Sequence, residues 1–154
     1  MRVPLGPLLL ALLVASGCED IRRFNGGWAG EISADPVHQL GFGPTAILRA
    51  NITAVSRTGA EMTIDLPDRG GALPFEPIRR AAGDALGDMR LDGEPLRTYL
   101  GYVRVPGQEA YLAVVSLFPE DRVDVRIIRG PDETYAIFSL RRATALGDAG
   151  TTSD

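Results

Sequence analysis

Hydrophobic and polar residues alternate along most of the chain, which is the pattern of β-strands that turn one face toward a core. The alternation is clearest in the segments 46–54, 61–66 and 123–127. In the first of these, the predicted inward face consists of Ala46, Leu48, Ala50, Ile52 and Ala54. Two further segments are apolar at nearly every position, which predicts strands that are covered on both faces, 111–118 and 135–140.

Four weaker segments complete the set of predicted strands: 28–33, 72–78, 88–91 and 98–105. Turn sequences rich in glycine, proline and aspartate separate the segments, such as RTGA, PDRGG and RGPDE. No apolar stripe with the period of a long helix interrupts them. Eight or nine short strands in this arrangement predict an all-β fold over 26–142, either a small antiparallel barrel or a sandwich.

Composition narrows the classes of function. All 16 basic residues among the 154 are arginines, and the absence of lysine excludes a Schiff-base lysine and the lysine of a P-loop. Acidic residues number 20, so the formal net charge is -4. A nucleic acid is therefore not an expected partner, because its binding needs a basic surface.

The first 18 residues have the features of a bacterial export signal. Arg2 precedes the apolar segment 5–14, which is shorter than the roughly 20 residues that span a bilayer. Three small residues then lead to Cys18, the only cysteine. This segment resembles the lipobox of bacterial lipoproteins, although Ala15 stands where leucine is commonest. The resemblance implies that Cys18 carries fatty acyl chains such as palmitate, and that the chain is cut just before it.

Other roles for Cys18 fit the sequence less well. A disulfide needs a second cysteine, and a zinc site needs about four ligands, whereas the chain has one cysteine and one histidine. Ordinary secretory cleavage prefers an A-x-A-like site and leaves an unpaired thiol, and a cytosolic start is the remaining alternative. The preferred interpretation is a lipoprotein anchored in the membrane of the bacterial cell envelope. Its predicted parts are a signal peptide (1–17), a lipidated cysteine with a polar tether (18–25), the β domain (26–142) and a disordered tail (143–154).

The two ends of the predicted domain carry a second resemblance. Gly26 and Trp28 form a Gly-x-Trp motif on the first strand, and Arg141 or Arg142 closes the last one. This pattern resembles lipocalin-like, or calycin, barrels, in which the tryptophan plugs the closed end and an arginine packs over its ring. The resemblance implies a structural plug formed by Gly26, Trp28 and Arg141. A core tryptophan in an unrelated β domain is the alternative.

Candidate catalytic chemistry is sparse. His38 is the only histidine, and no serine motif of the type G-x-S-x-G accompanies it. The densest acidic group does not match the spacing of a calcium-binding loop: Asp84, Asp88, Asp92 and Glu94. We therefore expect a non-enzyme without catalytic residues, cofactor or metal. A hydrolase with two carboxylates at one end of a barrel is the enzymatic alternative.

Two non-catalytic functions suit an anchored β domain. In the first, side chains fill the barrel, and its rim or an edge strand docks on an envelope protein. In the second, an open barrel carries an apolar small molecule or a lipid. The loop 34–44, with His38 and Phe42, is the candidate ligand loop, and Phe42 is expected to act as a flap. Small inward residues such as Gly101 leave space and Trp28 fills it, so both functions stay open, with the interaction module preferred.

Overall fold

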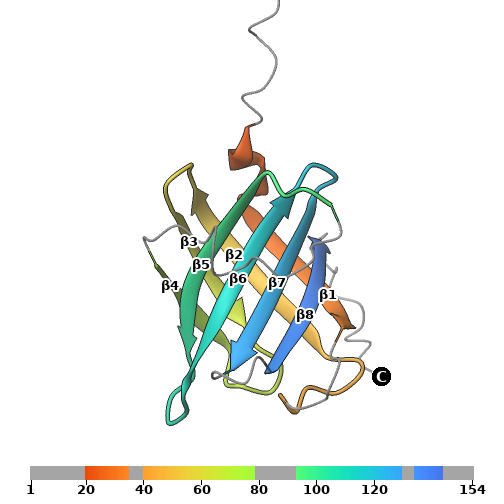
Figure 1. Cartoon of the computed structure of the whole chain (residues 1–154), viewed down its shortest axis with the longest axis vertical. Coiled ribbons are helices and arrows are strands. Elements are labelled where there is room, and N and C mark those ends of the chain that lie inside the picture. Colours follow the sequence, from red (N-terminus) through yellow and green to blue (C-terminus); the bar gives the residue numbers. More distant parts are fainter. Residues whose placement is uncertain (1–19, 35–39, 79–92, 130–133, 144–154) are drawn as a thin grey trace, which may run out of the picture.

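The structure is a computed structural model that describes residues 20–34, 40–78, 93–129 and 134–143. These residues form a closed barrel of eight antiparallel strands, in which sequence neighbours pair and the last strand pairs with the first (Figure 1). The predicted all-β fold is confirmed, and its form is a barrel. The elements in order are η1 (Ile21–Phe24), a 3-10 helix, then β1 (Gly26–Ala34), β2 (Ile47–Val55), β3 (Ala60–Asp65), β4 (Ala72–Pro77), β5 (Arg97–Arg104), β6 (Ala110–Phe118), β7 (Arg122–Arg129) and β8 (Thr134–Arg142).

Eight of the nine predicted strand segments correspond to these strands. The ninth, 88–91, lies outside the described residues. The prediction for the inward face of β2 is wrong at one residue, because Ala54 is exposed and Val55 takes the buried position. The pairing of β2 with β3 shifts register between Ile52 and Ala54, which marks a β-bulge. One extra residue in a strand reverses the alternation that follows it.

The prediction that 111–118 is covered on both faces is confirmed. On β6, Val115 faces the interior and is 0% exposed, while its outward neighbours Val114 and Ser116 are only 2% and 1% exposed. The outward face of β8 is covered less completely, because Ile137 and Ser139 are half-buried. The outer surface of the barrel is therefore most deeply buried over β6.

Polar side chains on the outward faces of β5 to β8 contact one another, and those of Ser116 and Asp124 are buried. Asp124 is 6% exposed, accepts a 2.9 Å hydrogen bond from the hydroxyl of Ser139, and lies 3.3 Å from Nε of Arg122. On the two strands before β7, the hydroxyls of Thr98 on β5 and Ser116 on β6 lie 3.1 Å apart. Buried polar groups normally need such partners, so these contacts belong to the packing of the barrel wall.

The interior of the barrel is filled by its own side chains. A single hydrophobic cluster runs through it, and its members include Trp28 and Phe138, each at most 1% exposed. The small inward residue Gly101 leaves no hollow, because a Cβ at this position would lie 2.4 Å from Cζ of Phe75. The Phe75 ring therefore occupies the space that a larger residue would take.

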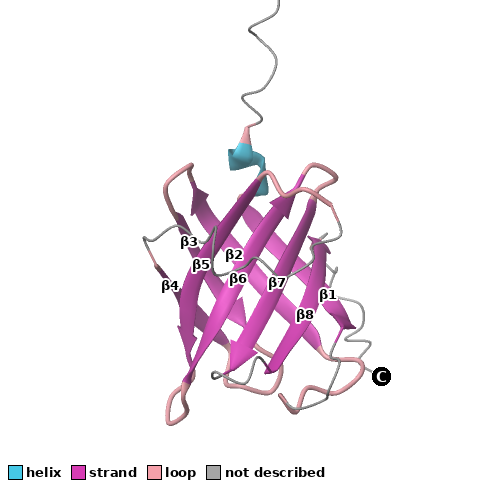
Figure 2. Cartoon of the chain, viewed as in Figure 1, coloured by secondary structure: helices cyan, strands magenta, loops and turns pink. Residues whose placement is uncertain are grey.

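The two ends of the barrel carry different elements (Figure 2). One end, which we call the capped end, carries η1 and the turns 56–59 and 119–121. The opposite, distal end carries the turns 66–71 and 105–109. Phe24 of η1 is fully buried against the barrel, so the predicted polar tether 18–25 is wrong over Ile21–Phe24. Only one residue, Glu19, separates Cys18 from the first described residue of the folded unit.

Candidate functional site

Trp28 lies buried at the capped end, directly beneath η1. Its indole N–H donates a 2.8 Å hydrogen bond to the carbonyl oxygen of Phe24, and the two rings stack with centroids 5.6 Å apart. The guanidinium carbon of Arg142 lies 4.7 Å from the centroid of the indole ring. Arg142 is also the register partner of Trp28 between β8 and β1. The indole therefore has a hydrogen-bond partner, an aromatic partner and a cationic partner, which close this end of the barrel.

The arginine over the ring is Arg142, so the prediction of Arg141 is wrong. The reason is the alternation along β8: Phe138 and Leu140 face the interior, and Arg142 continues that face. The guanidinium of Arg142 also donates hydrogen bonds to the carbonyl oxygens of Asn25 and Arg23. Arg141 points the other way and donates a 3.0 Å hydrogen bond to the carbonyl oxygen of Glu120.

The packing of Arg142 over the Trp28 ring also requires a glycine at position 26. Its φ of +123° is a conformation that residues with a side chain rarely adopt. A Cβ at this position would also lie 3.0 Å from Nη1 of Arg142. The glycine thus lets the chain pass from η1 into β1 while the arginine reaches the indole.

The distal end is closed by Phe42. The Phe42 side chain is 5% exposed, and its ring packs edge-on against Phe138 with centroids 5.5 Å apart. Arg69 lies 5.8 Å from the centroid of the Phe42 ring and donates a 2.8 Å hydrogen bond to the carbonyl oxygen of Leu40. Phe42 is therefore part of the core in this structure, and its role as a flap, which would need the ring to leave this position, stays a prediction. The other predicted loop residue, His38, lies outside the described residues.

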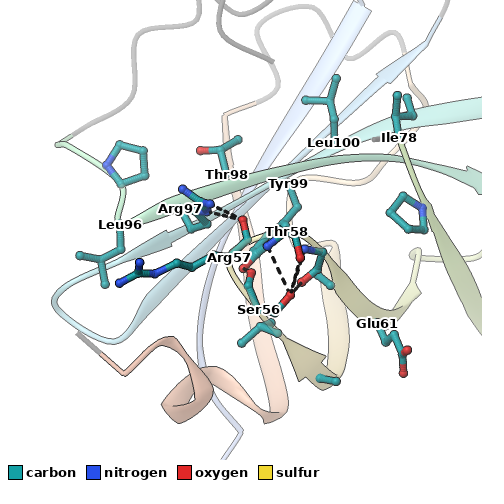
Figure 3. A pocket seen from close by; sticks show the side chains of 16 residues that line it. Ser56, Arg57, Thr58, Glu61, Ile78, Leu96, Arg97, Thr98, Tyr99 and Leu100 are labelled. Atoms are coloured by element: carbon teal, nitrogen blue, oxygen red, sulfur yellow. Dashed lines mark hydrogen bonds between the residues drawn. The ribbon is translucent and has the colours of Figure 1, made fainter. Parts of the chain in front are cut away.

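A hollow of about 1170 Å³ interrupts the barrel wall between β3 and β5 near the capped end (Figure 3). We call it the wall gap. It lies beside the second half of β4, because Ala72–Pro74 pair with β3 whereas Phe75–Pro77 pair only with β5. The residues that line it come from three segments, 54–61, 77–78 and 95–100.

Two side chains of β5 reach across the wall gap to the β2–β3 turn. The hydroxyl of Tyr99 donates a 2.7 Å hydrogen bond to the carbonyl oxygen of Ser56, and the guanidinium of Arg97 donates to the carbonyl oxygen of Arg57 (Figure 3). Tyr99 is buried on the inward face together with Val103. These hydrogen bonds therefore join the two sides of the gap on its inner side.

Burial raises the pKa of Tyr99 above its ordinary value of 10.0, against a smaller lowering effect of Arg97. Since the folded state holds this proton more tightly than the unfolded state, its stabilising effect is complete below pH 10 and is lost as the pH rises through the raised pKa. We expect Tyr99→Phe to lower the free energy of unfolding by about 0.5–1.5 kcal/mol at pH 8. The difference from wild type should shrink above pH 10. Denaturant titrations between pH 8 and pH 12 measure it, and a difference that stays constant over this range would contradict the assignment.

No group of three histidine, cysteine or acidic residues that would hold a metal ion is found among the described residues. Over the same residues, no helix is long and apolar enough to cross a membrane. Comparisons of the chain with protein-family models, with curated proteins and with solved structures find no match. Three candidate sites are therefore defined by the geometry of the described residues alone. They are the two closed ends of the barrel and the wall gap.

Proposed function

We propose that this chain is a lipid-anchored lipoprotein of the bacterial cell envelope, and that its barrel is a non-catalytic module that binds a protein partner. The observation that carries the proposal is the filled interior. Large side chains occupy the barrel, with Trp28 and Phe24 closing one end and Phe42 the other. A barrel of eight strands is just wide enough for its own side chains or for one small ligand, and here the side chains take the space.

The chemistry of the interior supports the same proposal. Ligand sites usually combine an apolar lining with a few polar groups that fix the orientation of the ligand. Among the described residues, the buried polar and charged side chains are Ser116, Asp124 and Arg126, and all three lie on the outward faces of β6 and β7. The inward faces offer an apolar cluster in which the side chains contact one another.

The proposed anchor rests on the resemblance of the segment before Cys18 to a lipobox. Cys18 stands two residues before Asp20, whose carboxylate accepts a hydrogen bond from the backbone N–H of Arg22 at the start of η1. Two extended residues span at most about 7 Å. An acylated Cys18 would therefore hold the capped end of the barrel close to the membrane surface, with the distal end farther away.

A carrier of an apolar molecule is the second candidate. The placement of Gly26, Trp28 and Arg142 favours it, since this arrangement resembles the closed end of lipocalin-like barrels. To admit a ligand, the barrel would have to release Phe42 from its contact with Phe138 at the distal end. Such a movement would expose a ring that is now 5% exposed.

An uncharged apolar dye, N-phenyl-1-naphthylamine, tests the choice between the two functions. The form to use is the chain from residue 19 to 154, which retains every described residue and strand pairing. We expect no saturable fluorescence increase for the wild type, because the interior has no room for the dye. Phe42→Ala should remove the closure of the distal end, admit the dye, and lose about 3–5 kcal/mol of stability.

The matched control is Tyr102→Ala, which removes an aromatic ring that is 39% exposed on the barrel wall. This variant should leave both dye binding and stability close to those of the wild type. Saturable binding of one dye molecule per wild-type chain would contradict the filled interior and favour the carrier.

A further inference from the structure

We infer that the capped end of the barrel binds an anionic phospholipid surface through four arginines, which we call the arginine rim: Arg22, Arg23, Arg141 and Arg142. The inference rests on the proposed function and deepens it, because it names the surface that meets the membrane once Cys18 is acylated. It goes beyond the anchor, since an acyl chain alone leaves the barrel free to tilt, whereas the rim fixes its orientation on the membrane.

The arginine rim forms where η1, the turn between β6 and β7, and the end of β8 meet. Arg23 of η1 donates a 2.7 Å hydrogen bond to the carbonyl oxygen of Pro119, and Arg141 of β8 donates a 3.0 Å hydrogen bond to that of Glu120. Arg142 donates to the carbonyl oxygen of Arg23. Three segments that are far apart in the sequence therefore place their guanidinium groups on one surface.

The rim keeps a positive charge because its guanidinium groups are bonded mainly to neutral acceptors. Arg141 and Arg142 donate to backbone carbonyl oxygens, and Arg22 is exposed on η1. Among the described residues, the ion pairs of the rim involve Arg23, which lies 3.3 Å from a carboxylate oxygen of Asp121, and not the other three arginines. A guanidinium has five N–H donors, so one that is bonded to a carbonyl oxygen keeps donors for phosphate oxygens.

The two ends of the barrel differ in charge. Over the described residues of the capped end, arginines outnumber acidic residues by seven to four, in the segments 20–25, 56–59, 93–97, 119–122 and 141–143. At the distal end the two kinds of residue are equal, with four of each in the segments 31–34, 40–49, 65–72 and 104–110 together with Arg129. An anionic surface therefore attracts the capped end more strongly than the distal end.

The position of the rim favours a lipid surface over an acidic protein. The 3-10 helix η1 lies beyond the strand ends at the capped end (Figure 2). Four positions separate Arg22 from Cys18, which is at most about 14 Å of extended chain. Charges interact over about 10 Å at 0.1 M salt, and the fork of a guanidinium matches two phosphate oxygens. An acylated Cys18 therefore brings lipid phosphates within reach of the rim.

Vesicle binding tests the inference with the chain from 19 to 154, because η1, every strand and both closed ends lie within it. The probe is a vesicle of equal parts phosphatidylglycerol and phosphatidylcholine, and sedimentation measures the bound fraction. We expect binding at low salt that is at least tenfold weaker on vesicles of phosphatidylcholine alone. Added sodium chloride should release the protein, because it screens the interaction.

Protein variants assign the binding to the rim. Arg22→Gln and Arg141→Gln should each weaken binding about fivefold, which corresponds to one arginine at an anionic membrane surface, and the double variant about 25-fold. The matched control is Arg49→Gln, which removes the same charge from an exposed residue near the distal end. Its affinity should stay within about twofold of the wild type, because the screened field of the membrane is weak at that distance.

Fluorescence quenching measures the orientation of the bound barrel. The chain from 19 to 154 has no cysteine, so Thr58→Cys at the capped end and Gln108→Cys at the distal end each offer one site for a fluorophore. Both positions are exposed. A lipid that carries a nitroxide on its headgroup should quench the fluorophore at position 58 and leave the one at position 108 bright.

Several results would overturn the inference: equal binding to both kinds of vesicle, an equal loss of affinity in Arg49→Gln and in the rim variants, or stronger quenching at the distal end. Release by inorganic phosphate beyond that by sodium chloride at the same ionic strength would also overturn it, and would assign the rim to a small free anion. None of these measurements involves Cys18, so the failure of the anchor and the failure of the rim are distinguishable.

Discussion

Cys18→Ser is expected to abolish the incorporation of fatty acid and to release the protein from the membrane. The thiol is the acceptor of the acyl chains in the lipobox that the segment before Cys18 resembles, and a serine hydroxyl does not replace it there. Each buried methylene of an acyl chain contributes about 0.8 kcal/mol to membrane binding, so two or more chains make a stable anchor. Labelling with an alkynyl palmitate analogue in a bacterial host, followed by detergent phase separation, measures both effects.

The matched control for the anchor is Ser16→Ala, which changes a small residue of the same segment and keeps the cysteine. This variant should be labelled and should enter the detergent phase as the wild type does. Labelling that survives in Cys18→Ser would place the acyl chains elsewhere. If the wild-type protein stays unlabelled and in the aqueous phase, the anchor is contradicted. The N-terminal segment would then be an ordinary secretion signal or the start of a cytosolic protein.

Trp28→Ala is expected to lower the free energy of unfolding by about 3–5 kcal/mol. The indole is 1% exposed, stacks on Phe24, and lies under the guanidinium of Arg142. Its loss opens a cavity at the capped end and leaves the carbonyl oxygen of Phe24 without the indole donor. Urea titration followed by far-ultraviolet circular dichroism is the suitable measurement, because Trp28 is the only tryptophan and the variant has no indole fluorescence.

Two further variants separate the contributions of the aromatic ring and of the cation to this loss of stability. Trp28→Phe keeps an aromatic ring under the arginine and should lose less stability than the alanine variant. Arg142→Met keeps an apolar side chain over the indole and removes the cation, which should cost about 0.5–2 kcal/mol. A loss below about 1 kcal/mol in Trp28→Ala would contradict the placement of the indole in the core, because surface substitutions lie in that range.

Much of the barrel follows from the sequence because its strands have separate inward and outward faces. The alternation over 61–66 and 123–127 corresponds to β3 and β7, and the apolar segment 111–118 corresponds to β6, which is buried on both faces. The choice between Arg141 and Arg142 does not follow from such an alternation, because 135–140 is apolar at nearly every position. The burial of Phe138 and Leu140 on the inward face places Arg142 on that face.

Other features depend on contacts that a periodic pattern does not contain. The bulge at Ala54 reverses the faces of β2 without any proline or glycine to mark it. Phe42 reads as a loop residue between two glycines, yet it is buried against Phe138, more than 90 residues away in the chain. Such long-range packing overrides local patterns.

The wall gap was also missed, although part of its signal lies in the sequence. Segment 72–77 is as short as β3 and shorter than β5. It contains Pro74 and Pro77, which lack the N–H that a strand ladder uses. A short strand with two prolines predicts incomplete pairing. Which neighbouring edges remain unpaired depends on the register with β3 and β5, and that register is a property of the closed barrel.

The most direct test of the account compares the native and the denatured mass of the full-length protein purified from bacterial membranes. An anchored barrel that is filled by its own side chains predicts the same mass in both spectra: the chain from Cys18 onward plus covalently attached acyl groups. A chain without acyl groups would contradict the anchor. An additional stoichiometric mass that is present in the native spectrum and lost on denaturation would contradict the filled interior, and would show instead a barrel that carries a ligand.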